Sequence, residues 1–172
     1  MKRLLRAALL LLIALPGLAG CAATGGPLNL AHQAGAPEVM PYDEAADAAA
    51  VLAAAFAEAA AEDKLVLAIF GANWCHDSRA LAGQLQSPEL APFVDANFKV
   101  AYIDAGMPQA GEGRNLDLAT KFGVEGIRGT PTMLVLAPAG TLLNTPEDAK
   151  GWRNAAGLSA AEVRAALAGY TG

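Results

Sequence analysis

Gly71-Ala72-Asn73-Trp74-Cys75-His76-Asp77-Ser78-Arg79 directly follows a nearly continuous apolar run, Lys64–Phe70. An apolar run of this length is typical of a central strand that is covered on both faces. We expect a helix to begin at or just after Cys75 and to continue as far as Leu85. The stretch therefore predicts a strand that turns directly into a helix, with a cysteine at the helix N-terminus.

The rest of the chain predicts alternating helices and strands around this unit. Apolar residues at helical spacing, with acidic residues in the first turn, indicate a helix over Asp43–Glu62. Ser87 and Pro88 form a helix-start signal, and Ser159-Ala160-Ala161-Glu162 is a capping box for a last helix that ends near Ala168. The other expected elements are strands at 98–104, 132–136 and 141–143, the last two as a hairpin, a loop at 105–114, a helix at 115–122 and a helical turn at 145–147. This order predicts a three-layer α/β domain with a central mixed sheet of about four strands flanked by helices.

The N-terminal segment has the pattern of an export signal. Basic residues precede an apolar run over Ala7–Leu15, which is too short to span a bilayer comfortably. Leu18-Ala19-Gly20-Cys21 resembles the lipobox of bacterial lipoproteins, in which the cysteine becomes a lipid-modified N-terminus; an ordinary secretory signal is the alternative. We expect residues 1–20 to be a lipoprotein signal peptide, residues 21–42 a flexible tether rich in Gly, Ala and Pro, and residues 43–172 the folded domain.

The residue after Cys21 bears on the location of the protein. Ala22, in place of an aspartate, resembles the pattern of lipoproteins that are sent to the outer membrane. Several acyl chains on Cys21 would hold the protein stably on a lipid membrane. We therefore expect a protein of the bacterial cell envelope, lipid-anchored in the outer membrane, with its domain facing the periplasm.

Charge and cysteine content narrow the possible functions. The 172 residues carry 12 Lys and Arg against 17 Asp and Glu, a net charge of -5, and loss of the signal would remove only positive charges. This balance is unfavourable for binding nucleic acid or an anionic lipid surface, so we expect no nucleic-acid partner. The chain has 2 cysteines, and acylation of Cys21 would leave Cys75 as the sole free thiol. A disulfide framework is therefore not expected.

A second motif makes a family resemblance specific. Gly126-Ile127-Arg128-Gly129-Thr130-Pro131-Thr132 precedes the expected strand at 132–136, and Trp74-Cys75 ends the first core strand. Together with the order of elements, these motifs resemble the thioredoxin superfamily, in particular its periplasmic thioredoxin-like branch, over roughly residues 43–170. The resemblance implies that Pro131 is a cis-proline beside the active-site cysteine, and that the backbone of Thr130 pairs with an extended substrate segment. Arg128 is expected to be a surface residue.

Two residues depart from the usual pattern of this superfamily. Ser78 stands where a Cys-x-x-Cys site carries its second cysteine, and Ile69 replaces a buried acid that handles the second thiol's proton. Serine cannot resolve a mixed disulfide, although its hydroxyl can donate a hydrogen bond to the Cys75 thiolate. An external reducing thiol would then have to release any covalent adduct. The site is thus expected to be a monothiol Cys-x-x-Ser site.

The residues around the cysteine have opposing electrostatic effects. A helix N-terminus favours the thiolate form of a cysteine, and a protonated His76 would add to this effect. Asp77 works in the opposite direction, because a nearby carboxylate disfavours the thiolate. The catalytic residues would be Cys75, Ser78 and His76, and Trp74 is either a partly buried aromatic or a substrate contact.

We expect no cofactor and no metal, because three consecutive residues at a helix start diverge and cannot easily face one ion. The main hypothesis is a membrane-tethered monothiol oxidoreductase or isomerase that acts on disulfide- or thiol-containing proteins or small thiols. The alternatives are a peptide-binding module of the same fold without redox turnover, and an envelope-structural lipoprotein in which the thiol has no role. A live thiol is favoured by the combination of Trp74 and Cys75 at a helix start, His76 beside them and the Pro131 loop opposite.

Overall fold

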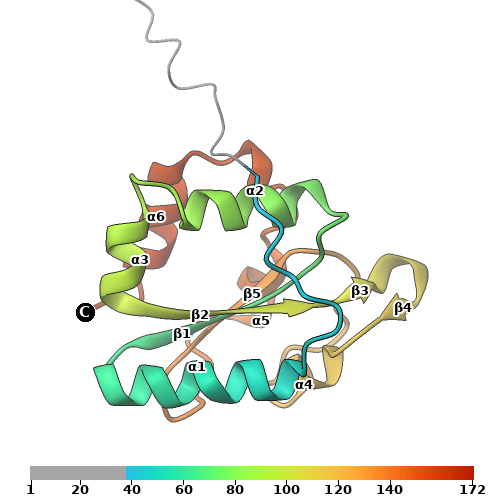
Figure 1. Cartoon of the computed structure of the whole chain (residues 1–172), viewed down its shortest axis with the longest axis horizontal. Helices are drawn as coiled ribbons and strands as arrows, with labels where there is room; N and C mark the ends of the chain where they lie inside the picture. The colour runs from blue at the N-terminus through green and yellow to red at the C-terminus, as the bar shows by residue number, and fades with distance from the viewer. Residues whose placement is uncertain (1–37) are drawn as a thin grey trace, which may run out of the picture. The chain divides into compact units, whose positions relative to one another are not determined.

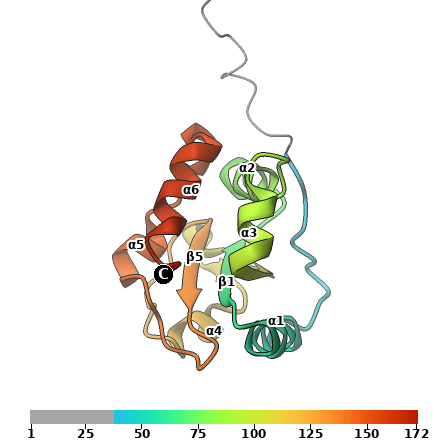
Figure 2. The same ribbon diagram turned by 90° about the vertical axis from the view of Figure 1, so that its left-hand side faces the viewer.

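The computed structural model describes residues 38–172 (Figures 1 and 2). The expected signal peptide, Cys21 and most of the expected tether therefore lie outside the described residues. Glu38–Tyr42, the last five residues of that expected tether, contact the domain, and Tyr42 is buried. Within the described part, no helix is long and apolar enough to cross a membrane.

A three-stranded mixed sheet forms the centre of the domain. Its order is β2 (Phe98–Asp104), β1 (Leu65–Gly71) and β5 (Thr132–Leu136), with β1 parallel to β2 and antiparallel to β5. Every residue of β1 after the first is buried, as the apolar run predicted. Both neighbours of β1 are strands, so the element that leads to Cys75 is the best-supported strand of the sheet.

Helices cover both faces of this sheet, which confirms the three-layer α/β prediction (Figures 1 and 2). One face carries α1 (Ala48–Glu62), α4 (Leu116–Thr120) and α5 (Pro146–Lys150). The other face carries α2 (His76–Leu85), α3 (Ala91–Asn97) and α6 (Ala160–Ala168), with the 3-10 turn η3 (Ala155–Gly157) before α6. Each face has its own cluster of buried apolar side chains, so the sheet separates two cores.

Local capping shifts two helix starts from their predicted places. The Asp47 side chain accepts hydrogen bonds from the N–H groups of Ala49 and Ala50, so α1 begins at Ala48 and its first turn contains no acidic residue. The Ser87 hydroxyl accepts from the Leu90 N–H at 3.3 Å, but regular α3 begins only at Ala91 after a turn. The predicted Ser159 capping box of α6 is present with both of its hydrogen bonds.

The predicted fourth strand at 141–143 is wrong as a regular strand, because only one bridge, between Leu136 and Leu142, forms there. The reason lies in Asn144, whose side-chain oxygen accepts from the Val135 N–H and whose amide donates to the Met133 carbonyl, both at 2.9 Å. This buried side chain satisfies part of the edge of β5, and the Leu143 N–H, which donates to the Val135 carbonyl at 2.8 Å, satisfies another part. A short edge of this kind is also a poor template for pairing with another chain.

The expected loop at 105–114 is instead a small ribbon with two short strands. β3 (Gly106–Met107) pairs with β4 (Glu112–Gly113) around a 3-10 turn, η2 (Pro108–Ala110). The Asp104 carboxylate holds the base of this ribbon, since it accepts from the Gly106 N–H at 3.1 Å and pairs with Arg114 at 3.0 Å. The ribbon extends beyond the end of β2, as Figure 1 shows.

The edge role of Asn144 can be tested by the substitution Asn144→Ala. The change leaves the buried Val135 N–H and Met133 carbonyl without partners, and we expect it to lower the free energy of unfolding by about 2–3 kcal/mol. Urea denaturation measures this loss. Asn154→Ala is the matched control, because Asn154 is exposed and makes no side-chain cap, and it should change stability by less than about 0.5 kcal/mol. Equal stability of the two variants would contradict the assignment.

Candidate functional site

The register of the sheet brings the two predicted motifs together. Phe70, next to the end of β1, pairs with Thr132, the first residue of β5. The chain that leaves β1 and the chain that enters β5 therefore meet at the same end of the sheet. As a result, the Cys75 Sγ lies 3.4 Å from the Thr130 carbonyl oxygen, and the Thr130–Pro131 peptide bond is cis, as the resemblance implied.

Cys75 occupies the N-cap position of α2, in agreement with the predicted helix start. Its side chain is 8% exposed and makes no capping hydrogen bond. The thiol donates instead to the Thr130 carbonyl. The helix N-terminus beside the thiol offers backbone N–H groups without intrahelical partners. The thiol thus lies between a helix start and the cis-proline loop, at the edge of the buried core.

Two buried hydroxyl groups near the thiol have no hydrogen-bond partner within residues 38–172. They are the Ser78 Oγ and the Thr130 Oγ1. Ser78 lies three residues after Cys75, one helical turn along, and the Ser78–Cys75 hydrogen bond expected from the sequence is not formed. Buried polar groups without partners are uncommon and call for an explanation. Neither hydroxyl is hydrogen-bonded to the Cys75 Sγ in this structure.

His76, which the sequence suggested as a neighbour that favours the Cys75 thiolate, pairs instead with Glu38. Its Nδ1 lies 2.6 Å from a carboxylate oxygen of Glu38, and its side chain is 65% exposed. The same carboxylate pairs with Arg79 at 2.5 Å, and Arg79 also donates to the Asn73 carbonyl. Glu38 therefore ties two side chains of α2 to the segment before α1.

Asp77 also has a structural partner away from the thiol. Its carboxylate accepts a hydrogen bond at 3.0 Å from the Ala156 N–H in η3. This contact joins the first turn of α2 to the segment before α6. From the sequence, this carboxylate was expected to disfavour the Cys75 thiolate. In the structure it joins two helical segments through a hydrogen bond.

Sequence reasoning missed the importance of Tyr42. Asn73 exchanges two hydrogen bonds with the Tyr42 backbone, and the Tyr42 ring lies so close to Gly71 that a Cβ there would come within 2.4 Å of it. The Tyr42 hydroxyl contacts the Ser78 carbonyl at 3.4 Å. Burial is the main cause that raises the pKa of Tyr42 well above its ordinary value, with smaller effects of Tyr102 and Cys75. Its burial could have been suspected from the sequence, because Tyr42 is the one aromatic residue in the expected tether.

Trp74 is an exposed aromatic with a fixed orientation. Its ring is 48% exposed, and its indole N–H donates to the Gly106 carbonyl in the ribbon at 3.1 Å. Met107, which is 40% exposed, lies in the same ribbon, and both side chains line a cavity of about 500 Å³. Trp74 is therefore a surface aromatic beside the thiol, held by the ribbon that the sequence indicated only as a loop.

Two further residues that the sequence singled out, Ile69 and Arg128, differ in burial. Ile69, which replaces the buried acid of the superfamily pattern, is fully buried in β1. Arg128 is exposed on the loop before β5. Within residues 38–172 no group of three or more His, Cys, Asp or Glu side chains is arranged to hold a metal ion.

Comparison with known proteins agrees with this geometry. A family profile described as thioredoxin-like matches residues 47–138, which include β1, Cys75 and Pro131. The chain belongs to this thioredoxin-like family. It is similar to the crystal structure of a disulphide isomerase from Xylella fastidiosa Temecula1, with 31% sequence identity and a TM-score of 0.69 over 78% of this chain and 98% of that one. No curated protein sequence gives a match. Thioredoxin-like proteins of this kind suggest substrates that carry a thiol or a disulfide.

The Glu38 contacts predict a dependence of stability on pH. The hydrogen bond from Arg79 is the main cause that lowers the pKa of Glu38 below its ordinary value of 4.5, and His76 contributes less. Because the folded-state pKa is the lower one, the stabilisation by Glu38 is present above pH 4.5 and is lost as the pH falls through that folded-state pKa. Thermal midpoints of wild type and Glu38→Gln, measured from pH 7 to pH 2.5, should converge at the acid end.

Glu89→Gln serves as the matched control for this measurement. Glu89 is exposed and forms no ion pair within residues 38–172. Its difference from wild type should therefore be small at every pH. A constant difference between wild type and Glu38→Gln across the whole range would show that the ion pairs do not stabilise the domain.

Proposed function

We propose that this protein is a membrane-tethered monothiol thiol-disulfide oxidoreductase or isomerase of the bacterial periplasm. The observation that carries the proposal is the position of the Cys75 Sγ, 3.4 Å from the carbonyl oxygen of Thr130 and next to the cis Thr130–Pro131 bond. Similarity to a disulphide isomerase and membership of the thioredoxin-like family support it. The monothiol character rests on Ser78, which replaces the second cysteine.

The first step would be attack by the Cys75 thiolate on one sulfur of a substrate disulfide. A new disulfide forms between Cys75 and that sulfur, the substrate S–S bond breaks, and the other sulfur leaves as a thiolate that takes up a proton. Before this step the Cys75 proton must be lost, so its hydrogen bond to Thr130 must break. The buried hydroxyls of Ser78 and Thr130, which make no hydrogen bond, would have to turn toward the anionic sulfur to donate to it.

The second step would require a thiol from outside the chain. If another thiolate of the same substrate attacks the mixed disulfide, Cys75 is regenerated and the substrate disulfide is rearranged without net oxidation or reduction. If a separate thiol attacks the Cys75 sulfur, the substrate leaves as a dithiol and Cys75 stays in a disulfide with that thiol. A second molecule of the thiol then regenerates Cys75, and the two external thiols end as one disulfide. Net oxidation of a dithiol by this chain alone is not possible, because the site has only one cysteine.

The tethering part of the proposal rests on the sequence before residue 38. A lipobox-like Leu18-Ala19-Gly20-Cys21 would place acyl chains on Cys21, and Ala22 favours the outer membrane. About 16 residues would then separate the lipid from Glu38, which at up to about 3.5 Å per residue is a reach of roughly 55 Å. A tether of this length would let the thiol meet substrates near the membrane surface.

A peptide-binding module without redox turnover is the second candidate. The burial of Cys75, only 8% exposed, favours it, since a thiol that reacts with proteins has to be reached by another sulfur. In that case the cis-proline loop and Trp74 would hold an extended segment, and the thiol would only pack. The two candidates differ in whether partners are held covalently.

The substitution Ser78→Cys tests the monothiol mechanism. Ser78 is fully buried and its hydroxyl makes no hydrogen bond, so a thiol of similar shape should fit. In wild type, mixed disulfides with substrates should persist until an external thiol is added. In Ser78→Cys, the new cysteine should resolve them internally, so that trapped covalent complexes fall by about tenfold. Non-reducing gels of cells treated with a rapid thiol quench measure the trapped complexes.

Cys75→Ala is the control, and it should give no covalent complex. Recovery of the same partners from Cys75→Ala and from wild type, without any covalent complex in wild type, would favour the binding module. An equal amount of trapped complex in Ser78→Cys and wild type would contradict the monothiol mechanism while leaving Cys75 as the reactive group.

A further inference from the structure

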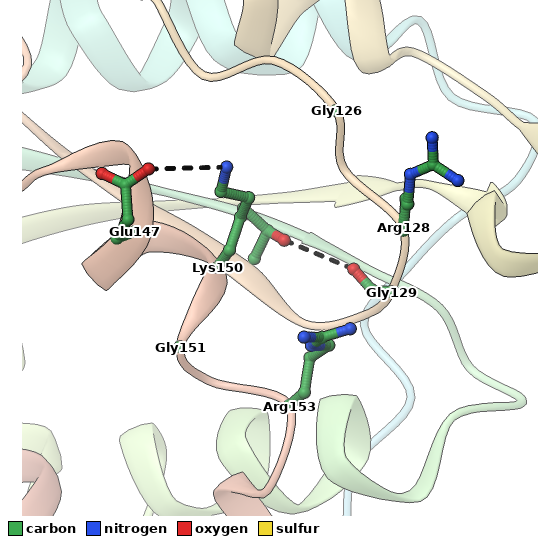
Figure 3. A pocket seen from close by; sticks show the side chains of 8 residues that line it. Gly126, Arg128, Gly129, Glu147, Lys150, Gly151 and Arg153 are labelled. Carbon is green, nitrogen blue, oxygen red and sulfur yellow. Dashed lines mark hydrogen bonds and ion pairs between the residues drawn. The ribbon is translucent and has the colours of Figure 1, made fainter.

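Beside the cis-proline loop lies a cavity with a cationic lining. Its volume is about 410 Å³, and its charged side chains are Arg128, Lys150, Arg153 and Glu147. Figure 3 shows that they come from two segments that face each other, the loop before β5 and the end of α5 with the residues after it. Three positive charges against one negative charge give the cavity a net positive charge.

This concentration of charge contrasts with the rest of the molecule. All 17 Asp and Glu residues and nine of the 12 Lys and Arg residues lie in the described part of the chain, which is therefore acidic. Within residues 38–172 every cation forms an ion pair except three, and one of these, Arg164, lies over the ring of Phe93 at 4.9 Å. The other two, Arg128 and Arg153, line this same cavity. Both guanidinium groups are thus available to an anion from outside.

The third cation of the cavity is only weakly engaged. Lys150 lies 4.0 Å from Glu147, whose side chain is 81% exposed, and its ammonium group is 3.5 Å from the Glu125 carbonyl. An exposed contact at this distance contributes little to stability. An incoming carboxylate can therefore compete with Glu147 for Lys150 at small cost.

The geometry of the loop ties this cavity to the thiol. Gly129 lines the cavity and directly precedes Thr130, whose carbonyl contacts the Cys75 Sγ. The stem of Arg153 lies across Gly129 so closely that a Cβ at that position would be 2.6 Å from the Arg153 Cδ. Glycine at 129 thus lets Arg153 rest on the loop that would hold an extended substrate, with its guanidinium in the cavity.

We propose that this cavity selects disulfide substrates in which acidic residues flank the reacting cysteine in an extended protein segment. The inference rests on the proposed function of Cys75. In an extended chain a side chain two residues from the cysteine is about 7 Å away, within reach of an arginine next to the loop. Carboxylates match the planar guanidinium groups of Arg128 and Arg153. On an otherwise acidic protein, this cavity would be the place where an acidic segment is attracted.

The test compares the rates at which Cys75 of the full chain reacts with two peptide disulfides. Each peptide carries one cysteine joined to 2-mercaptoethanol, with Glu in one and Gln in the other at the positions two residues before and two after. At low ionic strength, wild type should react about tenfold faster with the Glu peptide, and 0.5 M salt should reduce this ratio. In the double variant Arg128→Gln/Arg153→Gln the ratio should fall below about two.

Lys121→Gln is the matched control, because Lys121 is an exposed cation on the C-cap of α4 outside the cavity, and its ratio should equal that of wild type. A ratio near one in wild type, or an unchanged ratio in the double variant, would overturn the proposal. So would a carboxylate preference confined to small disulfides, measured with dithiodiglycolate against hydroxyethyl disulfide, because the substrate would then not be a protein segment.

A binding measurement separates this proposal from the reactivity of the thiol. Fluorescence anisotropy of the labelled Glu and Gln peptides, with Ser in place of Cys, reports their affinity for Cys75→Ala without any chemistry. If Cys75 reacts with neither disulfide peptide but the Glu peptide still binds about tenfold tighter, the cavity proposal holds and the proposed enzymatic function fails. If both peptides bind equally well, and the cavity substitutions do not weaken the binding of either, the cavity proposal is contradicted independently of the proposed enzymatic function.

Discussion

The pairing of Phe70 with Thr132 is the constraint on which the site depends. Since β1 is antiparallel to β5, this register brings the chain after β1 and the chain before β5 to one end of the sheet. Cys75 and Thr130, 55 residues apart in sequence, then meet at 3.4 Å. A slip of one residue in this register would turn the side chains of β5 to the opposite faces and would separate the thiol from the loop. The core of the sheet thus positions the chemistry.

Around that contact, three other segments of the chain hold the turn that carries Cys75. Tyr42 packs on Gly71 and exchanges hydrogen bonds through Asn73, the ribbon binds Trp74, and the segment before α6 donates to Asp77. These partners engage the residues that flank Cys75, and the thiol itself makes one hydrogen bond, to the Thr130 carbonyl. Under the proposed mechanism, the hydroxyls of Ser78 and Thr130, which are buried without a partner, are the groups that would stabilise a charged sulfur.

The parts of the fold that could be predicted are those with a strong local signal. The apolar run of β1, the strand at 98–104 and the Ser159 capping box lie as the sequence indicated, because burial and capping act on neighbouring residues. The contacts of Glu38, Tyr42 and Asn144 could not be predicted, since each joins segments that are distant in sequence or uses a side chain in place of a strand. The cavity beside Gly129 was missed for the same reason, because Arg128 and Arg153 converge only in the folded chain.

The one-thiol nature of the site is tested most directly by the fate of a covalent adduct. The full chain is allowed to react with a peptide whose single cysteine is joined to 2-mercaptoethanol. After the small thiols have been removed, the adduct is followed by mass spectrometry with mapping of the modified residue. One peptide adduct on Cys75 that persists for hours and is released only when an external thiol is added is the predicted result. Absence of an adduct at Cys75, or its release without any added thiol, would contradict a monothiol mechanism.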